Sequence, residues 1–225
     1  MPPSVAIIGA GPLGLMALKN FREDGFDATA FEARPYVGGL WQYSNDSSLS
    51  VAESTIFNSS RYRSAISDFP FPDDTDDFPT WQQLNAYLEG YVDKFNLRPH
   101  IKLNCPVTGL TRKDGRWRVE ISPKDVAGQK TAKYFDKVVV AIGSFVQPKQ
   151  PKFDGIEKFE GQTQHAINFH RSANFKGQNV VLVGLHATAQ DVAVCFQKDQ
   201  ANKLYISHRS GIILVRRFPL NLSKL

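Results

Sequence analysis

Apolar runs alternate with an amphipathic stretch at the start of the chain. Residues 5–8 form an uninterrupted apolar run, typical of a strand buried on both faces of a parallel sheet. Apolar residues then recur at helical spacing over residues 13–21, and Gly25 marks the end of the predicted helix. A second short apolar run, residues 28–31, predicts another strand. The pattern is therefore strand, helix, strand, one βαβ unit of an α/β fold.

The middle of the chain predicts a loop, a helix and a β-meander. Residues 44–77 are polar and contain several prolines, as in a long loop. Residues 80–95 carry apolar and aromatic side chains at helical spacing behind Thr80, a favourable N-cap, and we expect this stripe to face the core. Residues 101–103 lead into a meander over about 105–136, in which Asp114-Gly115 is a hairpin signal.

The opening pattern recurs near the end. Residues 137–142 predict a buried strand that returns to the first sheet, and a connection containing prolines follows it. A buried strand at 179–183, a helix at 187–197 and a strand at 203–207 then form a second βαβ unit. We predict an α/β fold of two Rossmann-like dinucleotide-binding domains, the first with the meander inserted and the second incomplete. The predicted domains are residues 1–155 and 156–225.

The first strand runs into a glycine-rich turn. Gly9, Gly11 and Gly14 have the G-x-G-x-x-G spacing, which allows a tight turn, the approach of a pyrophosphate and close helix packing. Pro12 falls in the first helical turn, where a missing N–H costs nothing. Glu32 closes the second strand, where an acidic residue binds a ribose hydroxyl in such units. The alternative is an ordinary glycine turn with a solvated Glu at a strand end.

The second unit carries a basic residue where the first has Glu32. Arg209, in His208-Arg209-Ser210, favours NADP over NAD, because a cation there accommodates the 2′-phosphate. The glycine motif is irregular, with His186 in place of the second glycine. If that position requires a positive φ, the side chain costs roughly 1–3 kcal/mol. A side chain there could also obstruct the pyrophosphate or, as an imidazolium, pair with it. We expect weakened NADPH binding.

Composition narrows the class of protein. The net charge is +5, but the basic residues are scattered and their clusters are too small to indicate nucleic-acid binding. No apolar run approaches the roughly 20 residues of a membrane span. The first strand begins too near Met1 for a signal peptide, so we expect a cytoplasmic protein. Cys105 and Cys195 are far apart and predict buried free thiols, with neither a disulfide framework nor a redox dithiol.

Several further motifs resemble the flavin-containing monooxygenase family. Residues 159–169 fit its F-x-G-x-x-x-H-x-x-x-(Y/F) pattern, and Phe169 stands where Baeyer–Villiger monooxygenases carry Trp. Residues 38–41, 57–60 and 68–74 look alike too. Taken alone, Gly38-Gly39-Leu40-Trp41 could equally be a close approach to a ligand or a loop that tucks Trp41 into the core. The resemblance covers essentially the whole chain.

The resemblance implies a role for each matching residue. Asn58 would lie near the flavin and the nicotinamide as the catalytic residue, although without the family match an Asn holding a turn is the better interpretation. His165 would shape the hinge between the cofactor domains. The FAD site would comprise Gly9, Gly11, Pro12, Leu13, Gly14, Glu32, Leu40, Trp41, Asn58 and Ser59, and the NADPH site Gly184, Thr188, Ala189, Asp191 and Arg209.

The family's chemistry belongs to its flavin. NADPH reduces FAD, O2 forms a C4a-hydroperoxyflavin, and a soft nitrogen or sulfur centre of a small molecule takes one oxygen; no metal site is expected. The chain stops at Leu225, soon after the first βαβ unit of the second domain, whereas the family completes that domain and then the FAD domain. We therefore expect a fragment, a truncated product or a working short form. A flavin-binding remnant without turnover and an uncoupled oxidase that produces hydrogen peroxide are the alternative functions.

Overall fold

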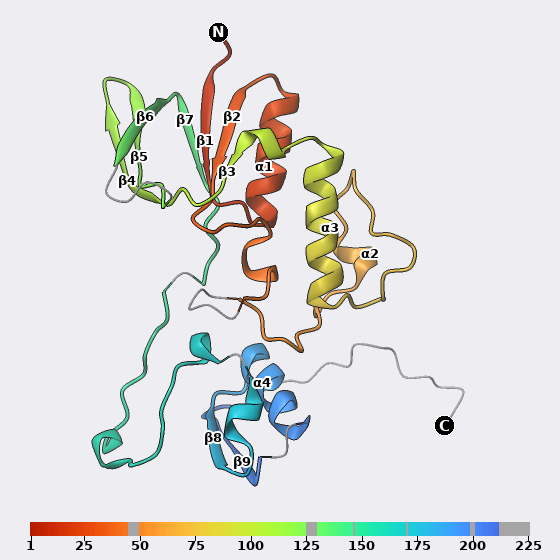
Figure 1. Cartoon of the computed structure of the whole chain (residues 1–225), viewed down its shortest axis with the longest axis vertical. Helices are drawn as coiled ribbons and strands as arrows, with labels where there is room; N and C mark the ends of the chain where they lie inside the picture. Colours follow the sequence, from red (N-terminus) through yellow and green to blue (C-terminus); the bar gives the residue numbers. More distant parts are fainter. Residues whose placement is uncertain (45–49, 125–129, 146, 170, 199–200, 212–225) are drawn as a thin grey trace.

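The computed structural model describes residues 1–44, 50–124, 130–145, 147–169, 171–198 and 201–211. Over these residues the chain forms a parallel sheet of order β3-β2-β1-β7, an antiparallel sheet of order β4-β5-β6, and the parallel pair β8-β9 (Figure 1). The strands are β1 (Ser4–Ile8), β2 (Asp27–Phe31), β3 (Ile101–Lys102), β4 (Val107–Lys113), β5 (Arg116–Ile121), β6 (Thr131–Phe135), β7 (Lys137–Val140), β8 (Asn179–Val183) and β9 (Lys203–Ser207).

Two long helices cover one face of the parallel sheet, and the meander covers the other (Figure 1). Val5 and Ile7 of β1 are fully buried in the core that includes α1 and α3. Ala6, between them, belongs to the core made with the meander. The strand is thus buried on both faces, as predicted. The helices are α1 (Pro12–Glu23), α2 (Arg61–Ser64), α3 (Trp81–Lys94) and α4 (Ala187–Lys198), with 3-10 turns η1 (Gly39–Trp41), η2 (Arg98–His100), η3 (Ile156–Lys158), η4 (Ala166–Asn168) and η5 (Ser172–Phe175).

Local sequence signals account for the start of α3 and for the β4–β5 hairpin. Thr80 accepts a hydrogen bond from the Gln83 backbone amide while the Gln83 side chain accepts from the Thr80 amide, a complete capping box. Asp114 and Gly115 have φ of 50° and 80°, the signature of a type I′ turn. The predicted helix, its core-facing stripe and the hairpin are therefore confirmed.

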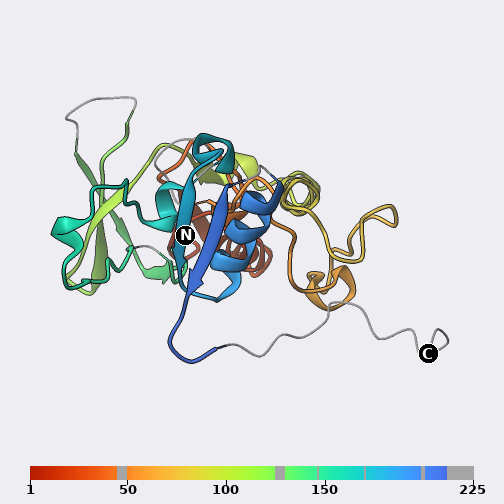
Figure 2. The same cartoon turned by 90° about the horizontal axis from the view of Figure 1, so that it is seen from below.

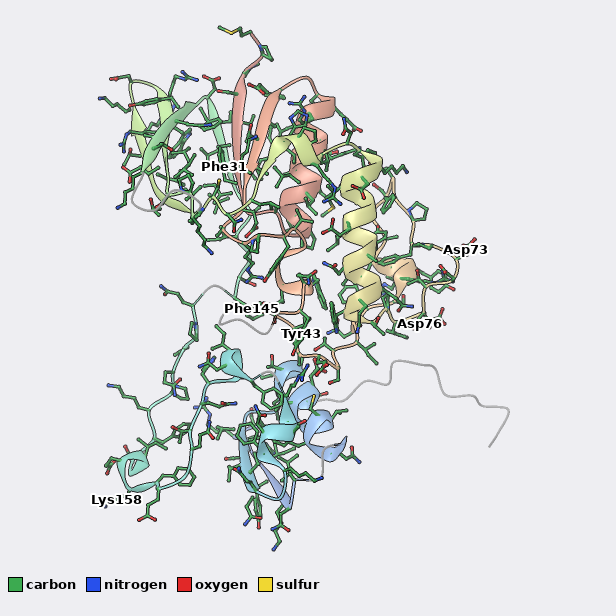
Figure 3. All side chains as sticks on the ribbon, viewed as in Figure 1. Phe31, Tyr43, Asp73, Asp76, Phe145 and Lys158 are labelled. Carbon is green, nitrogen blue, oxygen red and sulfur yellow. The ribbon has the colours of Figure 1, made fainter. Side chains whose placement is uncertain are left out.

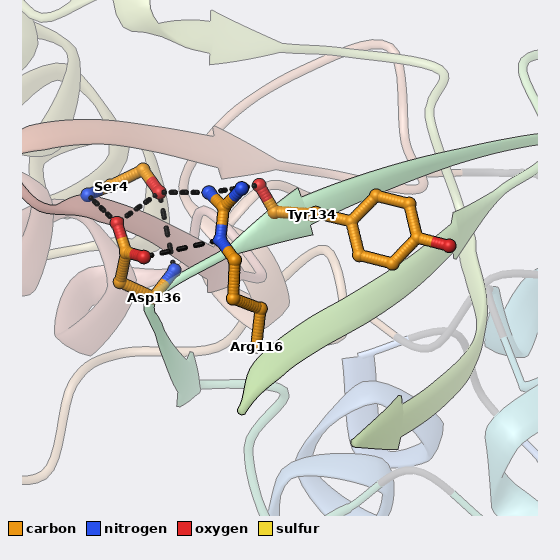
Figure 4. Close-up of polar contacts among 4 residues, drawn as sticks. All are labelled: Ser4, Arg116, Tyr134 and Asp136. Carbon is orange, nitrogen blue, oxygen red and sulfur yellow. Dashed lines mark hydrogen bonds and ion pairs between the residues drawn. The ribbon is translucent and has the colours of Figure 1, made fainter. Parts of the chain in front are cut away.

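A polar cluster fastens the meander to the start of β1 (Figure 4). The Asp136 carboxylate accepts hydrogen bonds from the Ser4 amide and hydroxyl, both at 2.7 Å, and from Arg116 Nε at 3.1 Å. A second Arg116 nitrogen donates to the Tyr134 carbonyl at 3.1 Å. The bonds from Ser4, with those from Arg116, hold the pKa of Asp136 below its ordinary value. Asp136 lies between β6 of the antiparallel sheet and β7 of the parallel sheet, so its carboxylate links the two sheets.

The second βαβ unit repeats the first. The Gly9 amide donates to the Phe31 carbonyl at 2.8 Å, and the Gly184 amide donates to the Ser207 carbonyl at 2.9 Å. In each unit the glycine follows the first strand and the carbonyl ends the second. Seen from below in Figure 2, β8 and β9 lie side by side with α4 beside them. The two Rossmann-like units of the predicted α/β fold are confirmed.

The prediction that β7 and β8 are buried strands is wrong, because each strand carries exposed valines. Val140 of β7 is 59% exposed, and Val181 and Val183 of β8 are 60% and 55% exposed. Strand β7 is an edge strand of its sheet, and within the described residues α4 packs on only one face of β8 and β9. An apolar run cannot distinguish a strand covered on both faces from one covered on a single face.

Two smaller expectations also change. Residues 101–103 were expected to lead into the meander, but Ile101 pairs with Ala30, so β3 belongs to the parallel sheet. Leu13 was placed on the apolar face of the first helix, yet it is 68% exposed, because it lies in the first turn and away from the sheet. The division of the chain at residue 155 stays a prediction. In the part of the chain that is described, no helix has both the length and the apolarity to cross a membrane.

Candidate dinucleotide-binding site

Packing requires two of the three glycines that follow β1. Gly9 has φ +101°, and a Cβ on it would lie 2.6 Å from the Ala141 carbonyl oxygen of the strand alongside. A Cβ on Gly14 would lie 2.0 Å from the Gly9 carbonyl oxygen, so a side chain there would push α1 off the turn. These glycines bring the N-terminus of α1 against the end of β1, which is the geometry that presents helix amides to an anion.

Gly11 is not required by the backbone. It is extended, with φ −73° and ψ −178°, and its added Cβ would meet only Gly39 Cα, at an ordinary 3.7 Å. From the other side, a Cβ on Gly39 would lie 3.0 Å from Gly11 Cα. Two glycine loops therefore face each other with no side chain between them. Gly11 caps α1 without a side-chain hydrogen bond, so the first-turn amides beside Pro12 and Leu13 suit a pyrophosphate.

Glu32 lies at the end of β2 and is oriented by the backbone. The residue is 7% exposed. Its Oε2 accepts a hydrogen bond from the Ala10 amide at 2.7 Å, and its Oε1 accepts from the Arg34 amide at 3.0 Å. Each carboxylate oxygen keeps a second lone pair, which can accept from a ribose hydroxyl. The geometry of this end of the sheet fits an adenosine ribose, the role predicted for Glu32.

Sequence reasoning missed two residues beside this site. Arg34 Nη1 donates to the Gly39 carbonyl at 2.9 Å and so holds the second glycine loop in place. The Asn85 side-chain nitrogen is buried and has no hydrogen-bond partner among the described residues. A Cβ on Gly38 would come within 2.8 Å of that nitrogen. The spacing of Arg34, two residues after Glu32, was a usable signal, whereas nothing local distinguishes Asn85.

The segment expected beside the flavin brings together Leu40, Trp41 and Phe57. Trp41 is half-buried against the core, and its ring meets that of Phe57 edge-on with centroids 4.8 Å apart. The two interpretations of this loop, a core Trp and a close approach, are therefore compatible. Tyr43 and Phe145 lie where the first unit faces the second (Figure 3). Asn58 and Ser59 follow Phe57 directly and are exposed.

Register defines the equivalent positions in the second unit. Gly184, with φ +122°, matches Gly9, and His186 takes the place of Gly11. His186 is exposed and does not lie in the left-handed region, so the strain considered for it is absent. Ala189 takes the place of Gly14, and its Cβ lies 3.9 Å from the position of a Cβ on Gly184. The turn is wider here, so Ala is accommodated where the first unit needs Gly.

The counterpart of Glu32 is His208, and Arg209 is the next residue. His208 Nδ1 accepts a hydrogen bond from the Gly211 amide at 3.0 Å. The side chains of His208 and Arg209 are both exposed. Thr188 is exposed in the first turn of α4. Asp191, one turn further along, accepts a hydrogen bond from Thr55 of the first unit at 3.1 Å. The structure thus gathers Gly184, Thr188, Ala189 and Arg209 at one end of the second unit.

The structure also shows the contacts of the 159–169 motif and of the two cysteines. His165 caps η4, where its Nδ1 accepts from the Ile167 amide at 3.1 Å, and Phe169 packs against Phe196 with ring centroids 5.4 Å apart. Cys195 is buried and Cys105 is half-buried, and both are free thiols. Over the described ranges, no three His, Cys, Asp or Glu side chains are grouped as metal ligands.

Comparisons with known proteins agree with this architecture. The family model described as flavin-binding monooxygenase-like matches residues 3–221. Monooxygenase aurF of Gibberella zeae is 39% identical over 218 residues, and dimethylaniline monooxygenase [N-oxide-forming] 2 of Oryctolagus cuniculus is 34% identical over 227 residues. These alignments cover 96% of this chain but 41% and 42% of the relatives. The chain therefore spans about two fifths of the length of these curated relatives.

The fold also has solved counterparts. The structure of S-allyl-L-cysteine S-oxygenase from Allium sativum superposes with a TM-score of 0.86 at 27% sequence identity. That alignment covers 98% of this chain and 54% of the other. Because the match extends over nearly all of this chain, it includes both βαβ units and the meander between them.

Proposed function

The chain belongs to the flavin-binding monooxygenase-like family, and from this premise we propose that it is an FAD- and NADPH-dependent monooxygenase, or the N-terminal portion of one. Members of the family bind FAD and NADP(H). The observation that carries the proposal is the repeat of one glycine turn in two units, with Glu32 beside the first and Arg209 beside the second. An acidic and a basic residue at matching strand ends suit two different dinucleotides.

In this proposal FAD occupies the first unit. The first-turn amides of α1 hold the pyrophosphate at the glycine turn, beside the contact between Gly11 and Gly39, while the Glu32 carboxylate accepts from the adenosine ribose. Leu40 and Trp41 line the flavin side, with Phe57 as the partner that fixes the Trp41 ring. When bound, the flavin would supply the redox chemistry that activates O2. The protein supplies orientation and exclusion of water.

The remaining predicted residues act on the nicotinamide side. Arg209 pairs with the 2′-phosphate, and the exposed amides at the start of α4, with Thr188, hold the pyrophosphate. Asn58 donates and accepts hydrogen bonds through its amide beside the reacting centre. The names of two relatives, an N-oxide-forming dimethylaniline monooxygenase and an S-oxygenase of S-allyl-L-cysteine, support a soft nitrogen or sulfur centre as the class of substrate.

One purification tests the proposal. The 225-residue chain should be isolated with a yellow flavin chromophore, NADPH should bleach it anaerobically, and air with a tertiary amine or thioether should yield the N- or S-oxide. A colourless protein that takes up no FAD contradicts the proposal. Bound flavin that NADPH does not reduce indicates a flavin-binding protein without turnover, and peroxide equal to the NADPH consumed, with every substrate, indicates an oxidase.

The variant Asn58→Ala separates catalysis from binding. We expect it to retain FAD and to be reduced by NADPH, but to lose most product while peroxide rises, because the amide beside the reacting centre is gone. Ser60→Ala, two positions further on and outside both predicted cofactor sites, is the matched control, because the Ser60 side chain makes no capping hydrogen bond to α2. Equal product from both variants would exclude a catalytic role for Asn58.

A further inference from the structure

A short loop, residues 53–57, is fixed to the beginning of α3. Trp81 Nε1 donates to the Glu53 carbonyl at 3.0 Å, and the Trp81 amide donates to the Thr55 carbonyl at 3.3 Å. The Phe57 amide donates to the Pro79 carbonyl at 2.8 Å. Three hydrogen bonds therefore hold the backbone of this loop on the first unit.

Side chains of the same loop contact α4 of the second unit. The Thr55 hydroxyl donates to Asp191 Oδ2 at 3.1 Å, and the Ser54 hydroxyl and the Cys195 thiol lie 2.8 Å apart. Asp191 and Cys195 are four residues apart and so lie on one face of the helix. Thr55 is 8% exposed and Cys195 is 9% exposed. The loop thus joins the two units through partly buried polar contacts.

The contact between Thr55 and Asp191 lies between the two candidate cofactor sites. Helix α4 begins directly after His186, in the glycine turn of the second unit, and Asp191 is one turn into it. On the other side, Thr55 precedes Asn58 by three residues, and Phe57 between them packs on Trp41. Trp41 ends η1, which begins at Gly39 opposite Gly11. A displacement of α4 would therefore act on Asn58 and Trp41 through the contacts that this loop makes with the helix.

We propose that Thr55 and Asp191 are positioning residues that couple occupation of the NADPH site to the setting of Asn58 and Trp41 beside the flavin. This inference rests on the proposed function. Asp191 Oδ2 accepts from the buried Thr55 hydroxyl, and such a hydrogen bond weakens steeply when its length or angle changes. The contact adds a positioning role to the role in NADPH binding predicted for Asp191.

Coupling of this kind is reciprocal. If NADP+ changes the affinity for FAD by some factor, FAD changes the affinity for NADP+ by the same factor. Couplings between sites are typically about 5- to 150-fold. The first quantity to measure is therefore the ratio of the NADP+ dissociation constants of the flavin-free and the FAD-loaded protein, each determined by titration. The second is the shift of the flavin absorption spectrum when NADP+ is added.

Four variants test the contact. Thr55→Val removes the hydroxyl but keeps the β-branched shape, and Thr55→Ser restores the donor. Asp191→Asn keeps an acceptor without the charge. Arg171→Gln is the matched control, because Arg171 forms an exposed ion pair with Glu53, at 3.4 Å, across the same junction. Comparable thermal unfolding of all four would show that the fold itself is retained.

We expect the wild-type ratio to be at least about fivefold. It should fall to near 1 in Thr55→Val with loss of the spectral shift, recover in Thr55→Ser, be intermediate in Asp191→Asn and be unchanged in Arg171→Gln. A wild-type ratio of 1, or an unchanged ratio in both Thr55→Val and Asp191→Asn, overturns the proposal while leaving the proposed function intact. A wild type that binds neither FAD nor NADP+ overturns the proposed function, and the positioning role with it.

Discussion

Replacing Gly14 by Ala tests the physical reason for the third glycine of the first motif. The added Cβ would lie 2.0 Å from the Gly9 carbonyl oxygen and 2.9 Å from the Gly9 carbonyl carbon. Both atoms are backbone, so no side-chain rotation relieves the contact. Helix α1 must move away by about 1 Å to reach 3.0 Å, below which real Cβ contacts essentially do not occur. This displacement would open the helix–strand packing behind Leu15 and Leu18.

The expected cost follows from two opposing effects. Overpacking of a well-packed site costs about 1–3 kcal/mol, and a contact this short belongs at the upper end. Ala favours a helix over Gly by about 1 kcal/mol, which offsets part of it. We therefore expect the free energy of unfolding to fall by about 2 kcal/mol, which lowers Tm by about 4–8 °C for a chain of this size.

Thermal unfolding with and without FAD measures both consequences. The rise in Tm produced by saturating FAD should also shrink in Gly14→Ala, because the first-turn amides of α1 move with the helix. The control is Ala189→Gly at the equivalent position of the second unit. There the methyl group makes an ordinary contact, so its removal should destabilise by about 1 kcal/mol or less and relieve nothing. A Gly14→Ala protein with the Tm of the wild type, or a higher one, would refute the reasoning.

Three further predictions concern the polar groups. The pKa of Asp136 is lowered in the fold by Ser4 and Arg116, so its stabilisation is complete above the ordinary value of 3.8 and is lost as pH falls through the folded pKa. Asp136→Asn should therefore lower Tm by more at pH 7 than at pH 3, and an equal difference at both pH values would contradict this. Arg209→Gln should weaken NADPH binding by about 10- to 100-fold while leaving NADH binding within about twofold, since a charge-assisted bond to the 2′-phosphate is lost; equal loss for both dinucleotides would exclude that role. His186→Gly should lower the NADPH dissociation constant, because it removes a side chain that can obstruct the pyrophosphate, and an unchanged constant would refute this.

Much of the fold could be predicted from local sequence signals. The glycine spacing, the capping box at Thr80 and the Asp114-Gly115 turn each specify backbone geometry within a few residues, so these elements could be predicted. The exposed faces of β7 and β8 could not. Burial of an apolar strand depends on what packs against it, and that is decided by elements distant in the chain.

The candidate site divides in the same way. The residues that we propose for dinucleotide binding, such as Gly9 and Glu32, follow from their distance from a strand end. The contact between Thr55 and Asp191 joins residues 136 positions apart, and no periodicity or motif indicates it. Sequence spacing also assigned Arg209 to the position of Glu32, whereas the strand register gives that position to His208.

The position of β7 has a consequence for the order of events during synthesis. The Ala141 amide donates to the Ile8 carbonyl at 2.8 Å, and the Gly9 turn is packed against the Ala141 carbonyl oxygen. Strand β1 therefore lacks one neighbour until residues 137–141 have left the ribosome, although every residue of the glycine motif emerges well before them. A nascent chain arrested before residue 137 would present β1 as an open edge, able to pair with other chains. Flavin capture is accordingly expected late in translation, and ribosome-bound chains of increasing length should acquire it in a single step once β7 is free to pair.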